Sequence, residues 1–99
     1  MAEFSVTAQA LKDKMEQLRT QNEHFKTMTN DLRDKEGILV TMWEGESRDM
    51  FHKEFQTSAN SLDNFYIGIN KYIQALAEII EKYVQAEQRS TEIARTQSR

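Results

Sequence analysis

Apolar residues in the first half of the chain recur in alternating steps of three and four. Their positions are Ala8, Leu11, Met15, Leu18, Phe25 and Leu32, and polar Asn22 and Thr29 occupy the two remaining places in the row. Heptad spacing of this kind puts the whole row on one face of a helix. Ser5 and Thr7 precede the row, and either hydroxyl can accept a hydrogen bond from a free N–H of the first turn. We therefore predict a helix over residues 6–40 that continues through Gly37.

The second half repeats the alternation over a longer stretch and adds a second row. The main row is Phe51, Phe55, Ser58, Leu62, Phe65, Ile69, Tyr72, Leu76, Ile79 and Tyr83, and the second row, at steps of seven, is Ala59, Tyr66, Ile73 and Ile80. This apolar face is wider than packing against a single helix requires. We predict a helix over residues 47–88. The side chains expected to pack the hairpin and a dimer are Phe51, Phe55, Leu62, Phe65, Ile69 and Leu76.

The stretch between the two segments contains the only tryptophan, Trp43, and one of three glycines, Gly45, in a chain without proline. Glycine adopts backbone angles that cost other residues energy, and tryptophan buries a large apolar area. We predict a turn at residues 41–46 that joins the two segments as an antiparallel hairpin. On structural grounds alone, Trp43 and Gly45 need do no more than form this turn and fill its underside.

A single hairpin of two helices leaves much of each apolar stripe in water, so the pattern also predicts a partner. Two hairpins related by a two-fold axis would close a four-helix bundle. A heterodimer with a related hairpin satisfies the same requirement. The mildly acidic net charge of −3 favours the homodimer, because self-association then meets little charge repulsion, but the sequence leaves both open. The expected fold is all-α, with one domain over residues 1–99 and a flexible, slightly basic tail at 89–99.

Composition excludes several classes of function. The net charge is −3, from 13 basic and 16 acidic residues, and no basic face is available for nucleic acid. The chain has no cysteine, and His24 and His52 stand alone as two surface histidines, so we predict neither a metal site nor a cofactor. No cleavable signal peptide or membrane-spanning run is present, which makes the cytoplasm the default compartment. No catalytic frame is recognisable, and we expect no enzyme.

The turn carries a resemblance to a known family. Trp43, Glu44 and Gly45, central in a cysteine-free chain of about a hundred residues, resemble the motif of the Trp-Xaa-Gly family. These proteins are the small Esx substrates of type VII secretion in Gram-positive bacteria and mycobacteria. Ser47 fits the small residue that follows the family's glycine, and Phe51 fits the aromatic residue beyond it.

The resemblance extends over residues 5–90 and includes the end of the second segment. Tyr83 and Glu87 stand four residues apart and resemble the family's secretion motif, a tyrosine followed by an acidic residue. It implies a virulence-associated helical homodimer that leaves the cytoplasm without a cleaved signal. It also implies that Trp43 and Gly45 of one subunit, with Tyr83 and Glu87 of the other, form a mark for the membrane-bound secretion ATPase.

The tail departs from the family pattern, in which further apolar residues often follow the acidic residue of the motif. Here Gln88, Arg89 and Ser90 intervene before Ile93 and Ala94. A second hypothesis is a chaperone or targeting partner for another helical-hairpin substrate, which would dock on the wide face of the second helix. Membrane disruption after export is disfavoured, since the polar faces mix both charges and lack the excess of Lys and Arg usual in such helices.

Overall fold

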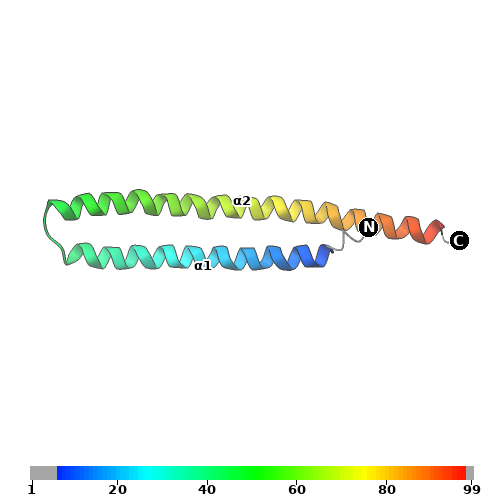
Figure 1. Cartoon of the computed structure of the whole chain (residues 1–99), viewed down its shortest axis with the longest axis horizontal. Coiled ribbons are helices and arrows are strands. Elements are labelled where there is room, and N and C mark those ends of the chain that lie inside the picture. The colour runs from blue at the N-terminus through cyan, green and yellow to red at the C-terminus, as the bar shows by residue number, and fades with distance from the viewer. Residues whose placement is uncertain (1–6, 98–99) are drawn as a thin grey trace. The chain divides into compact units, whose positions relative to one another are not determined.

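The computed structural model describes residues 7–97, with only the backbone described for residues 96 and 97. Two helices, α1 (Ala8–Thr41) and α2 (Glu46–Gln97), are joined by a short turn (Figure 1). The predicted all-α, antiparallel helical hairpin is confirmed. No strand occurs in the part of the chain that the structure describes.

Residues in contact group into two compact units, and each contains a segment of both helices. The turn unit is Thr20–Asn70, and the terminal unit combines Met1–Arg19 with Lys71–Arg99.

The turn between the helices is short, and its backbone reverses the chain. Met42 N donates a hydrogen bond to Leu39 O at 3.0 Å as α1 ends, and Arg48 N donates to Gly45 O at 3.1 Å as α2 begins. Gly45 has φ +112°, a backbone conformation that residues with a Cβ rarely adopt. The turn therefore requires glycine at this position because of the positive φ, as the prediction of the turn assumed.

Helix α1 starts two residues later than predicted and passes through Gly37 to Thr41. Thr7 is its N-cap, because Ala10 N donates to Thr7 Oγ1 at 3.1 Å. The alternative cap, Ser5, and the predicted first helical residue, Val6, lie outside the described residues.

Helix α2 is longer than the predicted helix over residues 47–88. It begins at Glu46 and continues beyond residue 88 to Gln97, whereas residues 98 and 99 lie outside the described part of the chain. The continuation contains no glycine or proline and is rich in Ala, Glu, Arg and Gln, which favour helix. A polar segment of this kind can extend a helix that packing has already nucleated.

The core of the terminal unit is apolar. Ala8 and Met15 of α1 are buried, as are Ile73 and Ile80 of α2, and Ile73 has the most completely enclosed side chain. Each pair is spaced by seven residues, so one row on each helix forms the contact. This unit is therefore stabilised mainly by removal of apolar surface from water.

The core of the turn unit is largely polar. At the same spacing of seven, α1 buries Asn22, Thr29 and Glu36, opposite a row on α2 that includes Ala59. Asn22 Nδ2 donates to Tyr66 O at 3.1 Å and to Asn70 Oδ1 at 3.0 Å. No buried side-chain nitrogen or oxygen in the described residues lacks a hydrogen-bond partner, which is the condition for a polar seam to be tolerated.

The main row predicted on α2 lies beside the buried seam. Phe55, Leu62, Ile69 and Leu76 are half-buried, whereas Phe51 and Phe65 are exposed. The closest contact with α1 is made instead by the second row, with Ala59 in the turn unit and Ile73 and Ile80 in the terminal unit. One seam is enough to join two helices, so the main row is left at its edge.

Candidate recognition site

The Trp and Gly of the turn lie at an exposed apolar end of the turn unit. The half-buried Trp43 packs its ring against Phe51, with ring centroids 5.4 Å apart and planes inclined by 51°. Around it, Met42 is 78% exposed, and Ile38 and Met50 are similarly open to solvent. The turn therefore presents a flat aromatic ring and flexible methionine side chains, a combination suited to binding another protein.

Helix α1 has no acidic residue in its first turn and no basic residue in its last turn, so its own side chains do not offset the charges of its helix dipole. Side chains of α2 contact both of its ends. At the C-terminal end, Arg48 Nη1 donates to Val40 O at 3.5 Å and its guanidinium also pairs with Asp49. A positive charge at this end opposes the partial negative charge of the helix dipole. Arg48 therefore helps to hold the turn that carries Trp43.

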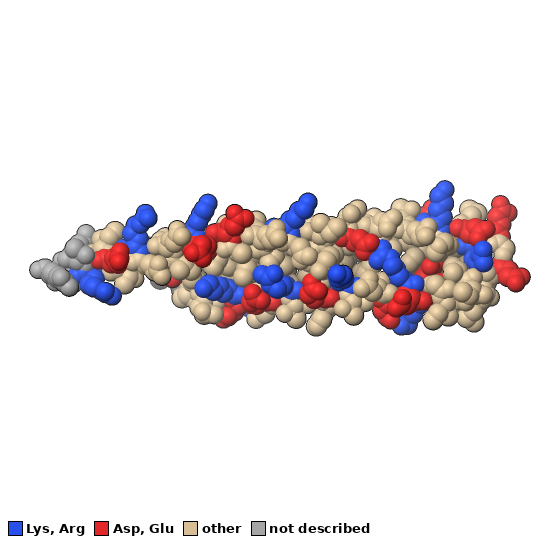
Figure 2. All heavy atoms as spheres, turned by 180° about the vertical axis from the view of Figure 1, so that it is seen from behind, with Lys and Arg blue, Asp and Glu red and all other residues tan. Residues whose placement is uncertain are grey.

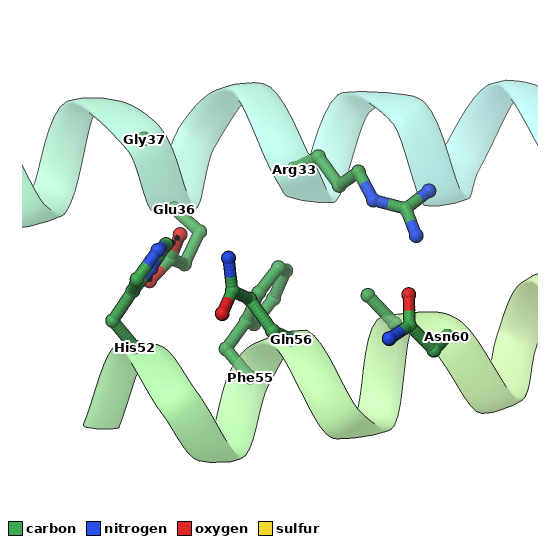
Figure 3. Close-up of a pocket in the computed structure, with 8 residues that line it drawn as sticks. Arg33, Glu36, Gly37, His52, Phe55, Gln56 and Asn60 are labelled. Carbon is green, nitrogen blue, oxygen red and sulfur yellow. Dashed lines mark hydrogen bonds and ion pairs between the residues drawn. The ribbon is translucent and has the colours of Figure 1, made fainter. Parts of the chain in front are cut away.

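A buried polar pair joins the helices next to the turn. Glu36 of α1 is 7% exposed, and His52 Nδ1 of α2 lies 2.8 Å from its Oε2. Figure 3 shows the two side chains pointing toward each other across the gap between the ribbons. A proton on Nδ1 lets His52 donate to the carboxylate, which would otherwise be buried without a partner.

Beside this pair, a groove of about 450 Å³ opens between the helices (Figure 3). It is lined by Arg33, Glu36, Gly37, His52, Phe55, Gln56, Ala59 and Asn60. The small residues Gly37 and Ala59 leave the space open, and nothing lies within 4 Å of a Cβ added at Gly37. The described residues contain no group of three or more His, Cys, Asp or Glu side chains able to hold a metal ion.

Both predicted surface histidines reach solvent, since His24 is exposed and the His52 side chain is 42% exposed. The prediction did not include the pairing of His52 with Glu36. The sequence contained a signal that the prediction did not use. The row of sevens that starts at Ala8 reaches Glu36, and the row through Ala59 reaches back to His52. Polar residues on a buried row usually have a partner across the seam.

Further polar contacts cross between the helices on one side of the turn unit. Arg33 donates two hydrogen bonds to Asp63, one of them from Nη1 to Oδ1 at 3.0 Å. These hydrogen bonds lower the pKa of the Asp63 carboxyl and raise the pKa of the Arg33 guanidinium. Tyr66 donates its hydroxyl to Glu23 at 2.6 Å, and the ammonium of Lys26 lies 5.2 Å from the Tyr66 ring centroid. Together these contacts close this side of the hairpin.

The other side is apolar and open, and we call it the open apolar face. Phe25 and Phe65 meet there with ring centroids 5.3 Å apart. Its exposed members, all in the turn unit, are Met28, Leu32, Leu39, Phe51 and Phe65. In the terminal unit, Tyr72 and Ile79 are also exposed. Exposed side chains of this size, repeated at helical spacing, indicate an interface.

The tail motif lies in the terminal unit. Tyr83 is half-buried and Glu87 is exposed one helical turn later, and with Ala86, Ser90 and Thr91 they line a shallow hollow. Glu87 Oε1 accepts a hydrogen bond from Ala8 N at 3.3 Å. The acidic residue of the motif is thus in contact with the first residue of α1.

Charge is mixed over the surface seen in Figure 2, where Lys and Arg alternate with Asp and Glu. Among the described residues, neither helix contains a stretch long and apolar enough to pass through a bilayer.

Comparison with protein families assigns the chain. The family described as proteins of 100 residues with WXG matches residues 3–89. The chain belongs to the WXG100 family. WXG100 proteins are non-enzymatic substrates of type VII secretion, so the family resemblance and the prediction that this chain is not an enzyme are confirmed. No curated protein and no solved structure matches this WXG100 chain.

Proposed function

We propose that this WXG100 protein is exported as a folded homodimer by a type VII system and that a composite signal directs its export. The observation that carries the proposal is the exposed turn with Trp43 and Gly45, in a chain whose family is exported by this route. Trp43 supplies the recognised ring, and Gly45 supplies the backbone angle that presents it.

The second part of the proposed signal is Tyr83 with Glu87. Both lie on one face of α2, in the hollow that they line with three small or hydroxyl-bearing residues. A tyrosine and a carboxylate one turn apart give a partner an aromatic surface beside an acceptor. We propose that the membrane-bound secretion ATPase binds this pair together with the turn of the other subunit.

The homodimer is supported by the open apolar face. Five apolar residues are buried in the described chain, while twelve large apolar residues are exposed. Packing the open apolar faces of two copies together would form a four-helix bundle and remove the exposed side chains of that face from water. The mild net charge of −3 opposes self-association little.

The test compares Trp43→Ala and Tyr83→Ala with wild type in the native bacterium, blotting culture medium and cell pellet separately. We expect both variants to remain in the pellet as soluble dimers. Ile67→Ala is the matched control, because Ile67 is exposed beside the polar contacts of Tyr66 and lies outside the signal. Wild-type amounts of both signal variants in the medium would exclude the composite signal.

A second function is favoured by the same open apolar face, which would also accept a different hairpin. In that case the chain is a chaperone or targeting partner for another WXG100 substrate. Light scattering of the purified chain separates the two. A stable mass of two chains supports the homodimer, and an aggregating or molten monomer supports a missing partner.

A further inference from the structure

The acidic residue of the tail motif makes a contact that recognition by a secretion partner does not require. Glu87 Oε1 accepts a hydrogen bond from Ala8 N, which is the first N–H of α1. Thr7 already satisfies Ala10 N through its hydroxyl and Leu11 N through its carbonyl. Glu87 therefore takes a donor that the N-cap leaves free.

The charge of Glu87 also matches what α1 lacks. No acidic residue occurs in the first turn of α1, although a negative charge there would be favourable. Glu87 supplies that charge from α2. It also marks the point where α2 passes the start of α1, since residues 88–97 continue as helix beyond it.

We propose that Glu87 is a positioning residue of the export signal, which acts by joining the first turn of α1 to α2 and so fixes the surface that carries Tyr83. This inference rests on the proposed export function. It refines the composite signal proposed above: the secretion ATPase binds the Tyr83 side of the hollow, and Glu87 holds that side in place instead of being bound directly. Thr7, outside the motif, becomes part of the same device because it orders the turn that Glu87 contacts.

Four variants of the full chain test the proposal. Glu87→Ala removes the acceptor, Glu87→Gln keeps an acceptor without charge, and Thr7→Ala loosens the same turn from the other side. Glu87→Ala combined with Ala10→Glu places a carboxylate three residues after Thr7, where it forms a capping box within α1. Thr27→Ala is the matched control, since Thr27 is exposed and bonds only to its own helix at Glu23 O.

Two measurements are made on each variant: amide hydrogen exchange of residues 8–11 and the ratio of protein in medium to protein in pellet. We expect Glu87→Ala and Thr7→Ala to exchange about two- to fivefold faster in this turn and to be exported less. Glu87→Gln keeps most of both properties, and Thr27→Ala changes neither. The Ala10→Glu combination recovers slow exchange but not export, because its carboxylate orders the first turn of α1 without joining it to α2.

The proposal is overturned if Glu87→Gln loses export while the first turn of α1 stays protected, because the carboxylate would then be read directly. It is equally overturned if Ala10→Glu restores export to Glu87→Ala, because an ordered first turn of α1 would then be enough without the contact to α2. Unchanged exchange in Glu87→Ala would show that the contact does not stabilise α1. Failure of the wild-type chain to leave the cell would instead remove the proposed function, and the exchange data would still decide whether Glu87 holds α1.

Discussion

Gly45 and Gly37 differ in whether the local backbone conformation requires glycine. Gly45 has φ +112° in the turn, with open space around the place of a Cβ, so its backbone angle alone demands glycine. Gly37 lies within α1, where the backbone is ordinary and the space around it is also open. The same residue type is therefore required at one position and costly at the other.

Substitution of Gly45 by alanine is expected to destabilise the hairpin by about 1–3 kcal/mol, the usual cost of a backbone conformation that L residues avoid. The midpoint of urea unfolding, followed by circular dichroism, measures the change. An unaltered midpoint would mean that the turn adopts another conformation at little cost.

Gly37→Ala is expected to stabilise α1 by about 1 kcal/mol, because alanine loses less backbone entropy in a helix and its Cβ meets no neighbour. The same urea titration provides the measurement. A lower stability would indicate that the groove beside Gly37 needs its full width.

At the scale of the elements, the helices are joined differently in the two units. The terminal unit has apolar residues in its seam, whereas α1 places Asn22, Thr29 and Glu36 in the seam of the turn unit. Buried polar residues favour one register between two helices, because each must lie opposite its hydrogen-bond partner. We infer that the pairing of Asn22 with Asn70 and of Glu36 with His52 sets the register of the turn unit.

His52→Ala should lower the stability of the turn unit by about 1–3 kcal/mol, because it leaves the buried Glu36 carboxylate without its partner. His24→Ala is the matched control, since His24 is exposed and its removal is expected to change stability by less than about 0.5 kcal/mol. Urea unfolding at neutral pH compares the two. Equal midpoints would show that solvent reaches Glu36.

The pair of Arg33 and Asp63 predicts a pH dependence. Its hydrogen bonds lower the pKa of Asp63 in the folded chain, so the pair adds stability above the pKa of an unfolded aspartate, about 3.9. That contribution is lost as pH falls through the lower, folded pKa. We expect Asp63→Asn to be less stable than wild type at neutral pH and to converge with it in strong acid. A thermal-melt difference that stays constant from neutral pH into strong acid would contradict this assignment.

At the scale of the whole molecule, the chain has two chemically different sides in the turn unit. Ion pairs and hydrogen bonds close one side, and the open apolar face leaves the other for a partner. Phe65 is 56% exposed on the open apolar face, while Ile67, two residues on, is 49% exposed beside the polar contacts. The two positions form a matched pair for testing the dimer.

If the chain forms the proposed homodimer, Phe65→Asp is expected to convert it to a monomer, because a carboxylate would be buried between the two open apolar faces. Ile67→Asp should remain dimeric, since position 67 points away from that interface. Size-exclusion chromatography with light scattering measures both masses. Dimers of both variants, or monomers of both, would place the interface elsewhere.

Sequence periodicity by itself determined the fold class of this protein. Spacing of three and four predicts long helices, Gly45 and Trp43 predict the turn, and their combination with Tyr83 and Glu87 is enough to indicate the family. These features are local, because helix propensity and turn geometry depend on residues close together in the chain.

Which row forms the seam was decided only by the tertiary structure. The sequence shows two candidate rows on α2, and only packing against α1 selects Ala59, Ile73 and Ile80 over the larger side chains beside them. Pairings such as Glu36 with His52 and Ala8 with Glu87 join residues far apart in sequence. Periodicity places each residue on a face of its own helix, but a contact also requires the register between two helices, which the packing of both determines.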